Sequence, residues 1–284
     1  RIKFGGTTMV SYCFAVRRIL TLVVCLLPAS TWAFTPLLSE SQGQLHLGWP
    51  LNEVGTRYDA NSGPILVRLN TIEFDEDENP SALSDKKIAF VTAQIIDAIS
   101  RWNNVTRSFL ELEFDGYEET TQWADTRDYI LISYMDLGTT GGKVSWTAEE
   151  GIYMPTAVRI NASHMMWPAT VETLTHELGH AIGLGHSDLT ENVSKHSWLQ
   201  LNDSQAAAMS YGVALSLSED DRAALRHKFP ATRGAERYGS IRGALVNADG
   251  SPIFGGRAFV VDDEGRTVSG VLTGLNTYDP DTEN

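Results

Sequence analysis

The sequence predicts an α/β domain followed by a smaller all-β module. Between residues 64 and 187, segments with strand-like alternation are interleaved with two stretches of helical periodicity. The resulting order of strand, helix, strands and helix is typical of a layered α/β domain. From about residue 233, short apolar segments alternate with Gly, Asp and Pro turns, which favours a small β-sandwich. A chain of 284 residues is long enough for one core and such an added module.

Residues 1–33 have the features of a secretory signal peptide. Two arginines precede the apolar stretch 19–27, which is too short to span a bilayer comfortably, and residues 31–33 form a plausible cleavage site. Met9 is the expected start, so that residues 1–8 would be upstream translation. An uncleaved membrane anchor is the alternative. We therefore expect a secreted or periplasmic protein, with no membrane contact beyond the signal peptide.

Signal cleavage would change both the redox chemistry and the charge of the chain. Cys13 and Cys25 both lie within residues 1–33, so the mature chain would have no disulfide and would depend on its core for stability. Cleavage removes four of the 22 basic residues and none of the 36 acidic ones, which moves the net charge from −14 to −18. Such an acidic surface repels nucleic acid and anionic membranes, and we expect neither as a partner.

The segments that follow the signal peptide lead into the α/β domain. Residues 34–62 have little periodicity and are expected to form a linker or a short pro-segment, and residues 64–70 a strand. The acidic stretch 75–80 is either a solvated turn or a calcium site, but the ligand spacing of a calcium loop is absent. Residues 84–102 predict an amphipathic helix with Ser84 as N-cap. Its apolar face comprises Ile88, Val91, Ile95, Ile99 and Trp102.

Several strands are expected between this helix and the next one. Three have alternating patterns, at residues 109–117, 129–137 and 157–163. The segment 141–146 is short and begins with two glycines, which favours a strand at the edge of the sheet.

The second helix starts near Thr170 and a third, shorter helix is expected at residues 218–229. The buried stripe of the second helix comprises Val171, Leu174, Leu178 and Ala181. In the third helix, Ser218 and Asp221 fit a capping box. Residues 232–284 then form the predicted β-sandwich module, which looks cut off at its C-terminal end.

The most informative segment is HELGHAIGLGH, which begins at His176. On a helix, His176 and His180 lie one turn apart on the same face and can bind one metal ion. Glu177 is displaced by about 100° around the helix and can stand beside the metal without binding it. Gly183 tolerates a positive φ, so the chain can leave the helix there and bring His186 back as a third ligand.

This ligand set favours catalytic zinc chemistry. Three imidazoles leave one coordination position open, whereas a closed structural site uses four protein ligands. Zinc lowers the pKa of its bound water towards about 7 and polarises a carbonyl oxygen. Glu177 is the expected general base, which takes the water proton and passes it to the leaving amine. The predicted reaction is hydrolysis of a peptide bond in a protein or peptide substrate.

The spacing HExxHxxGxxH resembles the signature of the metzincin metallopeptidases, and Ser187 after the third histidine is similar to the matrixin branch. The resemblance covers about residues 63–231. It implies a catalytic domain with a twisted, mostly parallel sheet, a zinc-binding helix and a substrate cleft. It also implies a methionine turn beneath the zinc, where Met209 fits; an ordinary core methionine is the alternative. The C-terminal segment 241–256 resembles the regulatory-type β-sandwich found beside carboxypeptidases.

The sequence also departs from the matrixin pattern. Tyr211 follows Met209 at a distance of two residues, which is more similar to serralysins and astacins. In those families the matching tyrosine contacts the zinc and then hydrogen-bonds the oxyanion; a buried tyrosine bonded to a backbone carbonyl is the alternative. His164 alone does not supply the second, structural zinc site of animal matrixins. It is expected, like His46 and His227, to be structural or solvent-facing.

Two functions from different classes remain. The first is a secreted zinc endopeptidase with His176, His180 and His186 as metal ligands and Glu177 as general base. The second is a catalytically inactive secreted adhesion or matrix-binding protein that uses the β-module. The intact Glu177 favours the enzyme, because an inactive relative could lose this residue freely.

Overall fold

The computed structural model describes residues 2–5, 63–122, 129–149, 152–165, 170–187, 207–210, 216–231, 245–253, 257–261 and 267–272. The apolar stretch of the expected signal peptide and the segment 34–62 lie outside the described residues. Tyr211 and His46 also lie outside them. Within the described part of the chain, no helix is both long and apolar enough to cross a bilayer.

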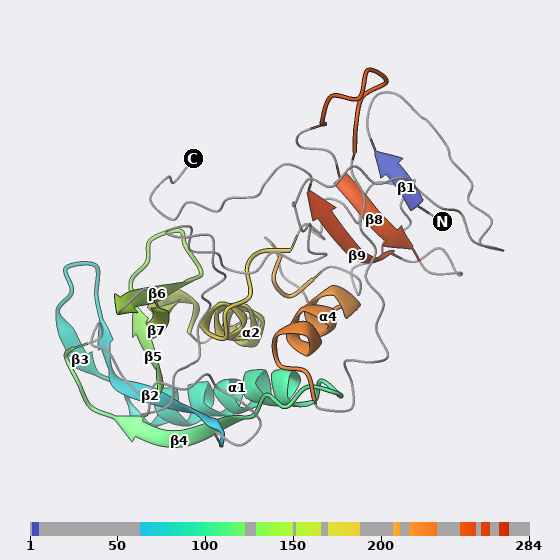
Figure 1. Cartoon of the computed structure of the whole chain (residues 1–284). Helices are drawn as coiled ribbons and strands as arrows, with labels where there is room; N and C mark the ends of the chain where they lie inside the picture. The colour runs from blue at the N-terminus through green and yellow to red at the C-terminus, as the bar shows by residue number, and fades with distance from the viewer. Residues whose placement is uncertain are drawn as a thin grey trace.

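The main sheet has three parallel strands at its centre. They are β2 (Ile65–Phe74), β5 (Ile130–Met135) and β7 (Ile152–Asn161), with β5 between the other two. Every residue of β5 is buried, which explains why its sequence is continuously apolar around Ser133 instead of alternating. The architecture is therefore mixed α/β, and the fully buried strand β5 lies in the middle of the strand order, between β2 and β7 (Figure 1).

The edges of this sheet are partly antiparallel. β6 (Gly142–Glu149) pairs antiparallel with β7 and ends the strand order on one side, so the edge strand predicted from residues 141–146 is confirmed. On the other side, β4 (Leu112–Glu118) pairs parallel and β3 (Pro80–Ala82) antiparallel with β2. β3 is not foreseen in the sequence. It follows a turn closed by Asp75, whose side chain accepts hydrogen bonds from the amides of Asp77 and Asn79.

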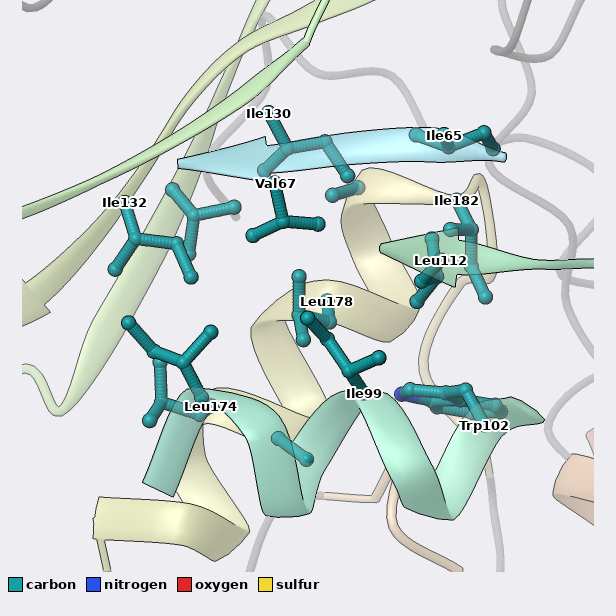
Figure 2. Close-up of a cluster of buried hydrophobic side chains, with 14 of the residues drawn as sticks. Ile65, Val67, Ile99, Trp102, Leu112, Ile130, Ile132, Leu174, Leu178 and Ile182 are labelled. Atoms are coloured by element: carbon teal, nitrogen blue, oxygen red, sulfur yellow. The ribbon is translucent and has the colours of Figure 1, made fainter. Parts of the chain in front are cut away.

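Two helices pack together to form the core with the sheet. α1 (Asp85–Asn103) begins at the predicted N-cap, since the Ser84 side chain accepts a hydrogen bond from the Lys87 amide. α2 (Thr170–Ala181) starts at the predicted residue. Figure 2 shows side chains from both helices and from the sheet meeting in one cluster. Full burial of each such apolar side chain contributes about 1.5–3 kcal/mol, so this cluster fixes the position of α2.

Trp102 joins the two helices by a polar contact as well as by packing. Its side chain is fully buried, and its indole Nε1 donates a hydrogen bond of 2.9 Å to the carbonyl of Thr175. A buried indole needs such a partner, because an unsatisfied donor inside the core is costly. The C-terminal end of α1 therefore holds the middle of α2 in register.

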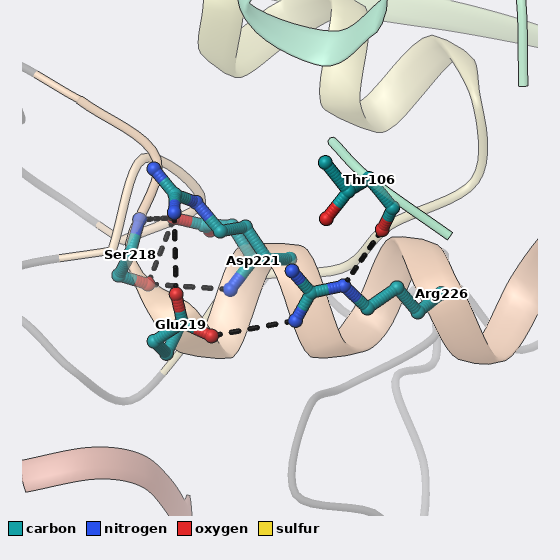
Figure 3. A network of polar contacts seen from close by, with 6 residues as sticks. Thr106, Ser218, Glu219, Asp221 and Arg226 are labelled. Atoms are coloured by element: carbon teal, nitrogen blue, oxygen red, sulfur yellow. Dashed lines mark hydrogen bonds and ion pairs between the residues drawn. The ribbon is translucent and has the colours of Figure 1, made fainter. Parts of the chain in front are cut away.

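A third helix, α4 (Glu219–Lys228), closes the domain. The predicted capping box is confirmed: the Ser218 hydroxyl accepts from the Asp221 amide, and the Asp221 carboxylate accepts from the Ser218 amide (Figure 3). At the other end, the Arg226 side chain donates to the carbonyl of Thr106, just after α1. The end of α4 is thus tied to the segment that follows α1.

The C-terminal part of the chain contributes a separate small sheet. β8 (Arg257–Val261) lies between β9 (Thr267–Leu272) and β1 (Ile2–Gly5), and both pairings are antiparallel. β1 precedes Met9 and was not expected from the sequence. The described residues form one sheet here, and the two-sheet sandwich stays a prediction.

Candidate metal centre

The chain turns back after the end of α2, as predicted from Gly183. The amide of Gly183 donates to the carbonyl of His180, and the amide of Leu184 donates to the carbonyl of Gly179. Gly183 has a φ of 87°, in the left-handed region that favours glycine. This pattern is a Schellman turn, and it satisfies carbonyls that the helix end would leave unpaired. The chain then runs back past the helix end and carries His186 towards it.

The three predicted histidine ligands converge. The Nε2 atom of His180 lies 3.1 Å from Nε2 of His176 and 3.2 Å from Nε2 of His186. Among the described residues, these three are the one group of at least three His, Cys, Asp or Glu side chains that could hold a metal ion. The cluster could therefore bind a metal through three nitrogen atoms.

The backbone fixes which nitrogen of two rings is available. Nδ1 of His176 lies 2.7 Å from the carbonyl oxygen of Ala208, and Nδ1 of His180 lies 2.7 Å from that of Leu184. A carbonyl only accepts, so each Nδ1 carries the proton and each Nε2 presents a lone pair. Lone pairs that face one another at about 3 Å repel in isolation, whereas a cation between them is stabilised. This arrangement is typical of oriented metal-ligating histidines.

Burial keeps these imidazoles in their neutral, ligating form. Desolvation lowers the pKa of His176, and it lowers the pKa of His180 to about 3 with help from the neighbouring His176 and His186. The pKa of His186 is lowered to about 4, again mainly by burial. A neutral imidazole has the free lone pair that metal binding requires.

Glu177 is buried between α2 and the edge strand β6. Its side chain is 5% exposed, and burial raises the pKa of its carboxyl to about 8. A Cβ added to Gly142 of β6 would lie only 2.7 Å from Oε1 of Glu177, closer than side-chain carbons approach. Gly142, the first residue of the edge strand, therefore makes room for the glutamate.

Met209 lies directly against the histidine-bearing helix. A Cβ on Gly179 of α2 would lie 2.1 Å from Sδ of Met209 and 2.9 Å from the ring of Trp102. The glycine between Leu178 and His180 is thus required for the methionine to pack there. Met209 is 2% exposed, so the turn that carries it is buried at this residue.

The turn at residues 207–210 is tied to the metal centre by its backbone. The carbonyl of Ala208 accepts from His176, as described above, and the carbonyl of Met209 accepts from the amide of Ser187 at 2.7 Å. The Asp221 carboxylate accepts hydrogen bonds from the amides of Ala208 and Met209 at 2.8 and 3.1 Å. Burial raises the pKa of Asp221, and these hydrogen bonds oppose that rise. One buried carboxylate therefore caps α4 and also holds the turn.

The structure brings together five of the residues predicted for the site: His176, Glu177, His180, His186 and Met209. The supporting residues were missed. Asp221 was assigned only to a capping box, and nothing in its local sequence indicates that the same carboxylate binds a turn twelve residues earlier.

The remaining histidines lie apart from this cluster or are not described. His227 is exposed on α4, which agrees with the solvent-facing one of its two expected roles. The backbone of His164 belongs to a 3-10 turn, Ala162–His164, which begins where the predicted strand 157–163 ends early. The strand stops there because the Asn161 side chain accepts a hydrogen bond from the Ser163 amide and starts that turn.

Comparison with known proteins does not assign the chain to a family. No family model and no curated protein matches it. Among solved structures, the chain is similar to one described as the GM1 bound form of the ECX AB5 holotoxin, with 15% sequence identity and a TM-score of 0.30. That alignment covers 64% of this chain and 78% of the other. A likeness this weak carries no information about the fold or the activity of the present chain.

Proposed function

We propose that this protein is a secreted or periplasmic zinc-dependent endopeptidase of the metzincin type. The observation that carries the proposal is the convergence of three imidazole Nε2 atoms beside a buried glutamate. Nitrogen ligands suit several transition metals, and three such ligands with a carboxylate nearby are typical of catalytic zinc sites. Bound by His176, His180 and His186, zinc would polarise a substrate carbonyl and make water more acidic.

Glu177 is the proton carrier in this proposal. It follows the first ligand on α2, and its carboxylate is held in the space that Gly142 leaves open. A positive charge at the histidine cluster opposes the effect of burial and favours the ionised carboxylate, which can accept a proton from water. The same group then donates that proton to the amine that leaves.

The edge strand β6 could bind a peptide through backbone hydrogen bonds, which do not depend on the side chains of that peptide. The amide of Asn161 donates to the carbonyl of Gly141, so this pair is hydrogen-bonded across β6 and β7. In an antiparallel ladder the bonding alternates, and the amides of Gly142 and Val144 therefore point away from β7. An extended peptide can pair with these outward groups as an added strand. It would then pass beside Glu177, which packs against Gly142.

The proposal is tested with the full chain and two variants. Wild-type protein should contain about one zinc per chain, cleave casein, and lose activity with a chelator. Glu177→Gln should retain zinc, because Glu177 is not a ligand, yet lose activity by roughly 10²–10⁴-fold, the range of general acid–base catalysis. Glu113→Gln, at an exposed glutamate of β4, is the matched control and should behave as wild type. Parent-rate cleavage by Glu177→Gln would refute the general-base assignment.

Zinc-loaded, folded wild-type protein that cleaves neither casein nor a mixed peptide library would contradict the peptidase proposal itself. The binding-protein alternative would then remain, and no observation in the described residues favours it now.

A further inference from the structure

A buried aspartate on α4 contacts two distant serines. The Asp220 side chain is 1% exposed. Its Oδ2 accepts a hydrogen bond of 2.6 Å from the hydroxyl of Ser187, and its Oδ1 accepts one of 2.5 Å from the hydroxyl of Ser269. Both serines are themselves buried, at 6% and 8% exposure. The two oxygens of one carboxylate therefore join parts of the chain that are far apart in sequence.

One of these serines belongs to the metal centre. Ser187 directly follows His186, and its amide also donates to the carbonyl of Met209. The segment that carries the third ligand is thus held on one side by the turn at 207–210 and on the other by Asp220. A change at Asp220 reaches His186 through a single intervening residue.

The other serine belongs to the C-terminal sheet. Ser269 lies on β9, and β9 packs next to α4, as Figure 1 shows. A buried carboxylate is costly unless its oxygens accept hydrogen bonds. The hydroxyl from β9 supplies one of these bonds, so docking of the small sheet completes the environment of Asp220.

We infer that the β8–β9 sheet is a functional part of the metal centre, and that Asp220 is a positioning residue that couples its docking to the His186 segment. The inference rests on the proposed metal site. Under this inference the C-terminal module influences the affinity of the site for its metal, whether or not the module also binds a partner. Because coupling between two sites is reciprocal, metal binding must also stabilise the docked sheet.

The first test compares Ser269→Ala with Ser251→Ala. Ser251 lies in the same C-terminal part of the chain, but it is exposed, and its hydroxyl donates to the exposed Asp249. Zinc affinity is measured by competition with a chromophoric chelator, and the Co²⁺-substituted proteins are compared by absorption spectroscopy. Ser269→Ala should weaken metal binding about tenfold, the lower end of outer-shell effects, and change the Co²⁺ spectrum. Ser251→Ala should do neither.

The second test uses the wild-type chain, so it does not depend on the folding of a variant. Hydrogen exchange of the β9 amides is followed with and without Zn²⁺, and Zn²⁺ should slow it. Exchange in β9 that is indifferent to Zn²⁺, or a Ser269→Ala protein with wild-type metal affinity, overturns the coupling while leaving the metal site intact. A wild-type chain that binds no metal overturns the proposed function as well, so the two failures are distinguishable.

Discussion

The segment at the end of α2 and the start of α4 contribute to the candidate metal centre in opposite ways. The end of α2 and the turn after it supply all three imidazoles and Glu177 from eleven consecutive residues. The geometry of this segment follows from the helix pitch and from the positive φ of Gly183. The start of α4 supplies no ligand. Its two neighbouring carboxylates, Asp220 and Asp221, accept hydrogen bonds from segments that lie 12 to 49 residues away along the chain. Ligands are thus encoded locally, whereas the groups that hold them in place are brought there by the fold.

The strongest test of this contrast is at Asp221. Asp221→Asn places an amide group where the backbone amides of Ala208 and Met209 donate, so at least one buried donor loses its partner. We expect a loss of about 3 kcal/mol or more in the free energy of unfolding, measured with urea. Asp249→Asn is the control, since that carboxylate also accepts from a turn but is exposed. Equal losses in both variants would show that the distant contact adds nothing.

The next prediction concerns Tyr211, which lies two residues after Met209 in the sequence and is expected to hydrogen-bond the oxyanion. Tyr211→Phe should lower kcat by roughly ten- to a thousandfold, the scale of losing one oxyanion donor. KM should change little, because the bond forms mainly in the transition state, and zinc should stay bound. Wild-type kcat in a folded, zinc-loaded variant would remove the tyrosine from the mechanism and favour a matrixin-like site.

A further prediction concerns the contact between Gly142 of β6 and Glu177 of α2. In Gly142→Ala the new methyl group overlaps the Glu177 carboxylate, so Glu177 must move. We expect kcat to fall about a hundredfold with zinc content unchanged, since displacement of a reacting group by about 1 Å has effects of this size. Gly141→Ala is the matched control, because its Cβ would meet only Thr173, at an ordinary 3.7 Å. A shared loss in both alanine variants would point to strand flexibility instead.

The smallest effect is expected at Val144. Val144→Pro removes an amide that points away from β7, so the ladder between β6 and β7 keeps its hydrogen bonds. KM for peptides should rise about tenfold, roughly the loss of one hydrogen bond, with zinc content unaffected. Val144→Ala keeps the amide and separates the loss of the side chain from the loss of the donor. Unchanged KM in the proline variant would place the substrate elsewhere.

The sequence predicted those parts of the molecule that depend on near neighbours. α1 and α4 follow from periodicity and from side chains that cap their own first turn, and the glycine turn at Gly183 follows from a conformational preference. β3 was missed because Pro80 argues against a strand, although an edge position tolerates it. The roles of Gly142 and Gly179 could not be predicted, because each depends on a side chain that only the tertiary fold brings against it.

The Schellman turn at Gly183 also bears on how the proposed metal site would take up an ion. The Nδ1 atoms of His176 and His180 each contact a backbone carbonyl, and the carbonyl of Leu184 belongs to the turn itself. Metal binding would therefore restrict few rotatable side-chain bonds, and little of the binding free energy would be lost as conformational entropy of the histidines. In small zinc domains the ion organises an otherwise unfolded chain. Here backbone carbonyls orient two of the three rings, and we expect the apoprotein to remain folded and able to bind the metal.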